Sequence, residues 1–448
     1  MNWQSVDGPG RVDRVARTES LGQSRFELFL ASPVDASYIE LTMRFGIDRL
    51  LSNSELQREL SGKRLAVVGN PASMTEAMLH SLDALIACDD LDLASSFGPQ
   101  HGMRGEKQDN MIESQDYVDP VHKIPVFSLY GEYRRPTDQM LDSFDHLLFD
   151  LQDLGCRIYT YISTLKYMLE ACASTGKSIW VLDRPNPAGR PIDGMRLVPG
   201  EESFVGCDEL PMRYGLTSGE LAGWFVHKNA LPVDLKVIEM EDYDPEAAPG
   251  FGWPSHGRAW ISPSPNASSL NMARCFPGTV MIEGTSLSEG RGTTMPLECI
   301  GAPDIDISKI LAAMAQLSRD WMQGADIRPC HFQPTFHKHA GNVCQAVQIH
   351  TDGQHYQHHT FRPYRLVALF LKALRQVHPR YPLWRAPPYE YEETRAPIDV
   401  INGSGDLRLW VDDDSATIAD LDVRLTREEQ EWQEERAPFL LYQPASRE

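Results

Sequence analysis

The 448-residue sequence has no run of about 18 consecutive apolar residues, the length that a membrane-spanning helix needs. Its first twenty residues contain no apolar core behind a basic start, so a standard secretory signal is not expected. The eight cysteines are scattered and none forms a C-x-x-C pair, which is typical of reduced thiols. These absences predict a cytoplasmic protein without a membrane span.

Basic residues are also scarce. The chain has 42 lysines and arginines against 63 acidic residues, so its formal net charge is −21. Nucleic acids and anionic membrane surfaces need a basic footprint, so neither is expected as the main partner. If the substrate is an anion, arginines within the site itself must capture it, because the field of the whole molecule repels it.

What the sequence does contain is a regular alternation of short apolar runs and amphipathic stretches. The polar residues 1–42 are expected to form an irregular extension, and a helical pattern begins at Met43. Five apolar runs follow, at 64–69, 92–97, 125–129, 146–150 and 178–182. Strand–helix alternation predicts βαβ units, so we expect an α/β fold with a Rossmann-like, mostly parallel sheet over residues 43–268.

A Pro/Ser/Asn-rich connection at 260–270 separates this domain from a smaller C-terminal α/β domain, predicted over residues 269–448. Its pattern includes a strand-like TVMIEG (279–284), the run AVQIHTDG (346–353) and a helix RLVALFLKALRQV (365–377). The two domains are expected to enclose a cleft.

Each of the five apolar runs ends in a polar cluster that contains Gly or Pro. In an open parallel sheet these clusters meet at the carboxyl edge, where ligands bind. Carboxylates that face one cleft from several strand ends can act as general acid and base, although each Asp can instead cap the helix that follows. The cluster comprises Gln100, His101, Arg104, Glu106, Glu132, Asp150, Asp153, Arg157, Asp183, Arg184 and Asn186.

A second candidate is the glycine-rich loop that begins at Glu283 and contains Glu289 and Arg291. Such a loop can bind an anion through its backbone amides, or it can be a tight turn with solvated charges. It has neither the G-K-[ST] ending nor the G-x-G-x-x-G spacing of nucleotide-binding loops. The sequence also lacks H-E-x-x-H and G-x-S-x-G, so we expect no metal, no nucleotide and no hydrolase serine.

Several long motifs stand out along the chain: GPQHGMRGE, VFSLYGEYRRPT, FDLQDLGCRIYTYISTL, VLDRPNPAGRPIDG, SFVGCDELPMRYGLTSGELA, SPSPN and EGTSLSEGRGTTMP. Together they resemble the exo-β-N-acetylmuramidase family of bacterial peptidoglycan hydrolases. The resemblance runs from about Gly46 to about Gly403. It implies a Rossmann-like catalytic domain, and removal of terminal N-acetylmuramic acid from the non-reducing ends of peptidoglycan fragments. The alternative is a non-catalytic muropeptide-binding or sensing protein on the same fold, since Gln100 stands where the family often has Glu.

Under this resemblance the predicted site has two groups of residues. Candidate catalytic carboxylates are Glu106, Asp150, Asp153, Glu283 and Glu289, with Asp153 expected to orient the substrate's 2-acetamido group and Glu106 or Glu289 to act as the acid. Candidate substrate-binding residues are Gln100, His101, Arg104, Glu132, Arg157, Tyr159, Arg184, Asn186, Asn266 and Arg291. Of these, Arg291 is expected to bind the lactyl carboxylate that distinguishes muramic acid from glucosamine, with Arg104, Arg157 or Arg184 as alternatives. No cofactor is expected.

Overall fold

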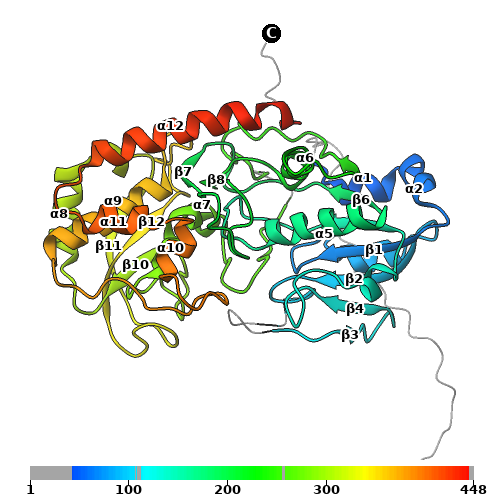
Figure 1. The fold of residues 1–448 in the computed structure, drawn as a ribbon, viewed down its shortest axis with the longest axis horizontal. Helices are drawn as coiled ribbons and strands as arrows, with labels where there is room; N and C mark the ends of the chain where they lie inside the picture. Colours follow the sequence, from blue (N-terminus) through cyan, green and yellow to red (C-terminus); the bar gives the residue numbers. More distant parts are fainter. Residues whose placement is uncertain (1–42, 106, 108–112, 255–257, 443–448) are drawn as a thin grey trace, which may run out of the picture. The chain divides into compact units, whose positions relative to one another are not determined.

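A parallel sheet forms the centre of the fold in the computed structural model, which describes residues 43–105, 107, 113–254 and 258–442 (Figure 1). The predicted extension over residues 1–42 lies outside the described residues, as does Glu106. All five predicted strands are present: β1 (Arg64–Gly69), β2 (Asp92–Gly98), β4 (Pro125–Ser128), β5 (His146–Asp150) and β6 (Ser178–Leu182). Their neighbouring pairs are all parallel, so the predicted sheet is confirmed.

The sheet has seven strands in the order β3-β4-β2-β1-β5-β6-β9. Two of these strands were not predicted from the sequence: β9 (Asp234–Ile238), which is parallel to β6, and the two-residue β3 (Tyr117–Val118), which is antiparallel to β4. The chain builds outward from β1 through β2 to β4 and then crosses to β5 on the other side. The strand order therefore reverses between β1 and β5, and in such sheets ligands bind outside the carboxyl ends near this reversal.

Both faces of the sheet are buried, which explains why its strands read as continuous apolar runs. Along β5, Leu147 and Phe149 belong to a core shared with α5 (Tyr161–Thr175) and α6 (Ser218–Lys228), whereas Leu148 points into a second core. That second core includes side chains of α1, α2 and α3, which span Gly46–Ser52, Ser54–Leu60 and Ser81–Ile86. The short α4 (Asp138–Leu141) lies between β4 and β5 in the chain. Alternate side chains of one strand thus anchor opposite helical layers.

The C-terminal part contains a three-stranded antiparallel sheet in the order β10-β12-β11. Its elements are α7 (Leu270–Thr279), η1 (Val280–Gly284), β10 (Cys299–Ala302), α8 (Ile307–Leu317), η2 (Asp320–Met322), β11 (Asp326–Phe332), β12 (Cys344–His350), α9 (Pro363–Val377), α10 (Pro397–Asn402), α11 (Asp406–Asp412), α12 (Ile418–Arg436) and η3 (Ala437–Phe439). The predicted helix at 365–377 is confirmed as part of α9. The strand predicted at TVMIEG is wrong, because this run ends α7 and then forms the 3-10 helix η1.

The α12 helix joins the two parts of the chain. It contacts β7 (Asp193–Arg196) and β8 (Pro211–Arg213), and in Figure 1 it runs from the C-terminal part back toward α6. Trp432 of α12 packs edge-to-face on Trp224 of α6, with ring centroids 5.1 Å apart. The described residues between 43 and 442 accordingly form one compact unit, and the division at 268/269 stays a prediction.

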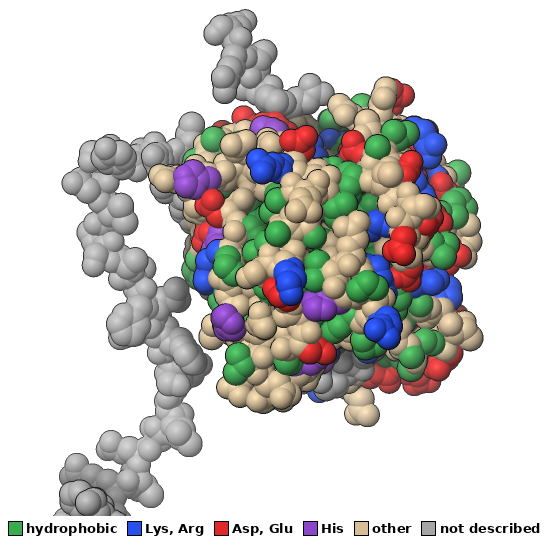
Figure 2. All heavy atoms as spheres, turned by 90° about the vertical axis from the view of Figure 1, so that its left-hand side faces the viewer, with side chains coloured by type: hydrophobic (Ala, Val, Ile, Leu, Met, Phe, Trp, Pro, Cys, Tyr) green, Lys and Arg blue, Asp and Glu red, His purple; other side chains and the backbone are tan. Residues whose placement is uncertain are grey.

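None of the described helices is both long and apolar enough to cross a membrane. Figure 2 shows the end of the molecule that carries the three-stranded sheet, where acidic and basic side chains are interspersed with apolar ones.

Candidate active site

One pocket lies where loops after the parallel strands meet the C-terminal part. It is lined by Gln100, His101, Ile158, Tyr159, Thr160, Val205, Ser264, Asn266, Met272, Phe276, Val280, Glu283, Arg291, Leu297, Tyr389 and Glu390. Six of the predicted residues meet here: Gln100, His101, Tyr159, Asn266, Glu283 and Arg291. The pocket therefore combines the strand-end cluster with the glycine-rich loop.

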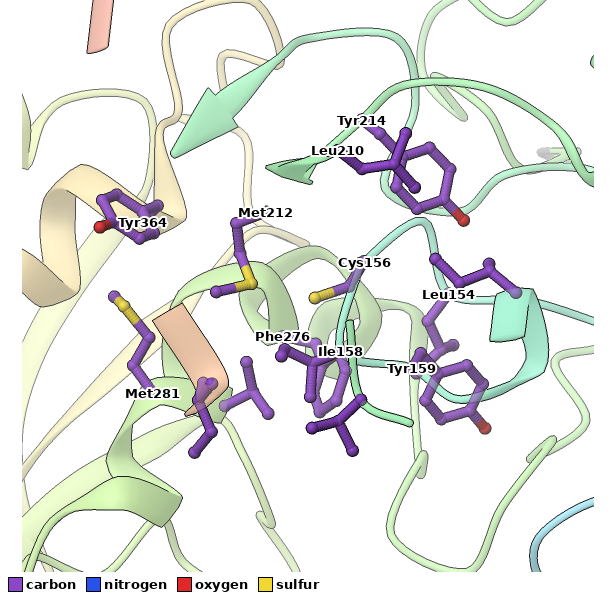
Figure 3. Close-up of a cluster of buried hydrophobic side chains, with 14 of the residues drawn as sticks. Leu154, Cys156, Ile158, Tyr159, Leu210, Met212, Tyr214, Phe276, Met281 and Tyr364 are labelled. Atoms are coloured by element: carbon purple, nitrogen blue, oxygen red, sulfur yellow. The ribbon is translucent and has the colours of Figure 1, made fainter. Parts of the chain in front are cut away.

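Buried hydrophobic side chains support the floor of this pocket. Figure 3 shows Ile158 and Tyr159, which precede α5, close to Phe276 of α7. The Tyr159 and Phe276 rings meet edge-to-face with centroids 5.8 Å apart. Two segments more than a hundred residues apart in the sequence thus share one apolar wall.

Gln100 follows the carboxyl end of β2 and is held by Thr160, whose hydroxyl donates to Gln100 Oε1 at 2.8 Å. Thr160 occupies the N-cap position of α5, yet its side chain does not cap the helix. Its hydroxyl instead fixes the orientation of the Gln100 amide, which also interacts with the Glu390 carboxyl group. Gln100 is therefore a preorganised polar group in the pocket.

Glu283, Arg291 and Glu289 form a buried ionic network. Arg291 donates from Nη2 to Glu283 Oε1 at 2.5 Å and from Nε to Glu289 Oε1 at 3.1 Å. Lys338 donates to the other Glu289 oxygen at 2.9 Å. Burial opposes ionisation of Glu289, but Lys338 and Arg291 outweigh it and lower its pKa to about 2. Glu289 does not line the pocket, and near neutral pH it has no proton to donate.

Glu390 and Tyr389 line the pocket but were not predicted from the sequence. Tyr389 donates its hydroxyl proton to Glu283 Oε2 at 2.9 Å, and Tyr130 donates to Glu390 Oε2 at 2.9 Å. Burial raises the pKa of Glu390 to about 7. These residues lie about a hundred positions beyond the glycine-rich loop in YEYEET, where the only sequence signal is a run of tyrosines and glutamates after two prolines.

Asp150 and Asp153 are buried beneath the strand ends and are not among the residues that line the pocket. Asp150 forms a two-point ion pair with Arg184, at 2.7 and 2.9 Å. Asp153 accepts hydrogen bonds from the Gly155 amide at 2.6 Å and from the Tyr214 hydroxyl. Burial raises the pKa of Asp153 to about 6, without a contribution from Asp150. Their predicted catalytic roles remain untested.

The remaining predicted binding residues also lie outside the lining of this pocket. Arg104 forms a two-point ion pair with Asp83 at 2.7 and 2.9 Å, and the exposed Glu132 accepts a hydrogen bond from Tyr133. Fully buried Arg157 donates to four backbone carbonyls, and Arg184 lines a separate pocket beside Phe45. The Asn186 amide donates to the Leu216 carbonyl. Arg291 is thus the candidate arginine that reaches the site.

Among the described residues, no group of three or more His, Cys, Asp or Glu side chains is arranged to hold a metal ion. The chemistry that the pocket offers instead is that of two carboxyl groups. Glu283 is ion-paired and accepts a hydrogen bond, whereas Glu390 lies in a setting that favours its protonated form.

Comparisons with known proteins identify relatives of this chain. A family model described as the N-terminal part of exo-β-N-acetylmuramidase NamZ matches residues 65–271, and the corresponding C-terminal model matches residues 274–442. The peptidoglycan β-N-acetylmuramidase NamZ of Bacillus subtilis is 35% identical over 405 residues, which cover 89% of this chain and 91% of that protein.

Two solved structures of DUF1343 family proteins from Bacteroides fragilis are also similar. One has a TM-score of 0.76 and 26% identity, and covers 90% of this chain and 99% of its own. The other has a TM-score of 0.68 and 24% identity, and covers 90% of this chain and 100% of its own, which supports the fold alone.

Proposed function

Because the chain belongs to the exo-β-N-acetylmuramidase NamZ family, we propose that it is a glycosidase that releases terminal N-acetylmuramic acid from the non-reducing ends of peptidoglycan fragments. The observation that carries this proposal is a single pocket lined by two glutamates, Glu283 and Glu390, in contrasting surroundings. Glycoside hydrolysis needs one carboxyl group that donates a proton and another that stays ionised.

The pocket also suits an N-acetylated sugar. Tyr159 and Phe276 offer an apolar aromatic wall to the sugar ring, and the amides of Gln100 and Asn266 can bind its hydroxyl groups. Arg291 is the arginine proposed to bind the lactyl carboxylate, which the net charge of −21 would otherwise repel.

For Glu283 we propose the role of orienting the substrate. An N-acetyl sugar carries its own nucleophile, the oxygen of the 2-acetamido group, and an enzyme carboxylate is then needed to hold that amide. Arg291 and Tyr389 hold Glu283 in place from two sides. In this scheme the enzyme itself supplies no nucleophile.

Hydrolysis of a chromogenic β-N-acetylmuramide, compared with the matching β-N-acetylglucosaminide, tests the function. We expect turnover of the muramide and little of the glucosaminide. Glu283→Gln keeps the shape of the side chain and should lower the rate on the muramide by roughly 100-fold or more. Tight binding of N-acetylmuramic acid without turnover of any muramide would instead support the alternative, a non-catalytic muropeptide-binding protein.

A further inference from the structure

The Glu390 side chain projects from a strained two-residue turn. Tyr389 and Glu392 exchange both backbone hydrogen bonds at 2.9 Å, which closes a tight hairpin with Glu390 and Tyr391 at its tip. Both tip residues have positive φ, of 44° and 69°. Hairpin turns with positive φ at both central positions strongly favour Asn-Gly, because side chains clash there. A glutamate and a tyrosine at these positions indicate a functional constraint.

Contacts from the N-terminal part hold this tip over the pocket. The Tyr130 hydroxyl donates to Glu390 Oε2 at 2.9 Å, and the Arg134 guanidinium lies over the Tyr391 ring at 3.9 Å. Tyr391 also meets Tyr130 edge-to-face at 6.4 Å. These contacts join the hairpin to a segment 260 positions earlier in the sequence. They fix the direction in which the Glu390 carboxyl group points.

The surroundings of Glu390 favour its neutral form near pH 7. Burial is the largest effect and raises the pKa to about 7, and the nearby Glu283 acts in the same direction. Hydrogen bonds from Tyr130 and Gln100 and the charge of Arg134 partly oppose this rise. A carboxyl group with a pKa near the working pH is well suited to donate a proton and take it back.

We propose that Glu390 is the general acid of the glycosidase, with Tyr130 and Gln100 as its positioning residues. This inference rests on the proposed function. The Glu390 proton moves to the glycosidic oxygen while the bond from that oxygen to the anomeric carbon breaks, and the bonding pair stays with the oxygen. The 2-acetamido oxygen bonds to the anomeric carbon in its place. Water then displaces the acetamido oxygen and returns a proton to Glu390.

The test compares two leaving groups in Glu390→Gln, which keeps the shape of the side chain. One substrate is an aryl β-N-acetylmuramide whose phenolate leaves without protonation, and the other is the disaccharide of N-acetylmuramic acid and N-acetylglucosamine. We expect a loss of roughly 100-fold or more on the disaccharide and a much smaller loss on the aryl substrate. Glu393→Gln, a change at an exposed glutamate just beyond the same turn, is the matched control and should leave both rates unchanged.

The pH profile gives a second readout. With the disaccharide, kcat/KM of the parent protein should fall as pH rises above about 7, because Glu390 loses its proton, and Glu390→Gln should lack this limb. Glu390→Asp retains a carboxyl group and should recover part of the lost rate. Equal losses on both substrates, or a parental rate on the disaccharide, would overturn the assignment. A parent protein that hydrolyses neither substrate would refute the proposed function, and this inference with it.

Discussion

At the scale of the residue, the pKa of each buried carboxyl group depends on the groups that surround it. Glu289 is held ionised by Lys338 and Arg291, with a pKa lowered to about 2 despite its burial. At Glu390 and Asp153 the groups that favour the carboxylate only partly offset burial, which raises the pKa of Glu390 to about 7 and that of Asp153 to about 6. The spacing of acidic residues in the sequence carries no information about these surroundings, so the acid at Glu390 could not be distinguished from its neighbours before the structure.

Asp153→Asn tests whether this buried aspartate is catalytic or structural. Its folded pKa of about 6 lies above its ordinary 3.8. Its contribution to stability is therefore fully present below about pH 4 and lost as pH rises through 6. The variant has no charge to bury, so between pH 4 and pH 7.5 its unfolding free energy should rise by about 2.5 kcal/mol relative to that of the parent. Urea unfolding at both pH values measures this difference.

Because Asp153 does not line the pocket, we expect Asp153→Asn to keep its rate on the aryl muramide within about tenfold of the parent rate. A hundredfold loss in a variant with unchanged stability would restore the catalytic role predicted from the sequence.

Arg291→Lys tests recognition of the lactyl group. Alanine at this position would leave both Glu283 and Glu289 without the arginine that they share. Lysine keeps the positive charge but lacks the planar guanidinium group that can bind a carboxylate through two hydrogen bonds. If Arg291 also binds the lactyl carboxylate, kcat/KM on the muramide should fall by about tenfold or more, since a charge-assisted contact is worth about 1.5–3 kcal/mol. The slower turnover of the glucosaminide is the control. An equal loss of kcat/KM on the muramide and the glucosaminide would mean that Arg291 only holds Glu283 in place and does not bind the lactyl group.

At the scale of the element, the strands were the most predictable part. The runs at β1, β2, β4, β5 and β6 are each short, apolar and followed by a cluster with Gly or Pro, and burial on both faces of the sheet produces that pattern. The run at η1 is equally apolar, and a short buried helix cannot be distinguished from a strand by periodicity. β9 escaped notice because its residues are mostly half-buried at the edge of the sheet.

The same limit explains which parts of the site were predicted. Gln100, Tyr159, Glu283 and Arg291 lie beside strand ends or in a glycine-rich loop, both of which are recognisable patterns. The hairpin at 389–392 reaches the pocket only through tertiary contacts with Tyr130 and Arg134. Its turn also lacks the Asn and Gly that would identify it in a sequence.

Tyr130→Phe tests the contact between the segment after β4 and this hairpin. The hydroxyl donates to Glu390 and thereby lowers its pKa, so removing it should raise that pKa further above 7. The alkaline limb of kcat/KM on the disaccharide should then shift to higher pH. Tyr133→Phe, a change at an exposed tyrosine on the same loop, is the control. A shift to lower pH would mean that the hydroxyl does not stabilise the Glu390 carboxylate.

At the scale of the whole molecule, the two regions matched by the family models are held together by the end of the chain. Arg436 donates to the carbonyls of Arg190, Tyr214 and Gly215, and the Tyr442 hydroxyl donates to Asp183 just after β6. Residues near the C-terminal end of the described chain thus form buried hydrogen bonds within the N-terminal part. The pocket is built from both regions, so its geometry depends on their cohesion.

Trp432→Ala tests this cohesion. Trp432 is fully buried, packs on Trp224 and donates from Nε1 to the Tyr214 carbonyl at 2.8 Å. Truncating a buried tryptophan typically costs about 3–5 kcal/mol, and here it should lower the unfolding free energy of both regions together. Chemical denaturation followed by fluorescence and by loss of muramidase activity should give coincident single transitions, both shifted to lower denaturant. Val423→Ala, on the exposed side of the same helix, should shift neither. Two separate unfolding transitions, with only one of them shifted by Trp432→Ala, would contradict this. They would mean that the two regions unfold independently and that α12 stabilises only one of them.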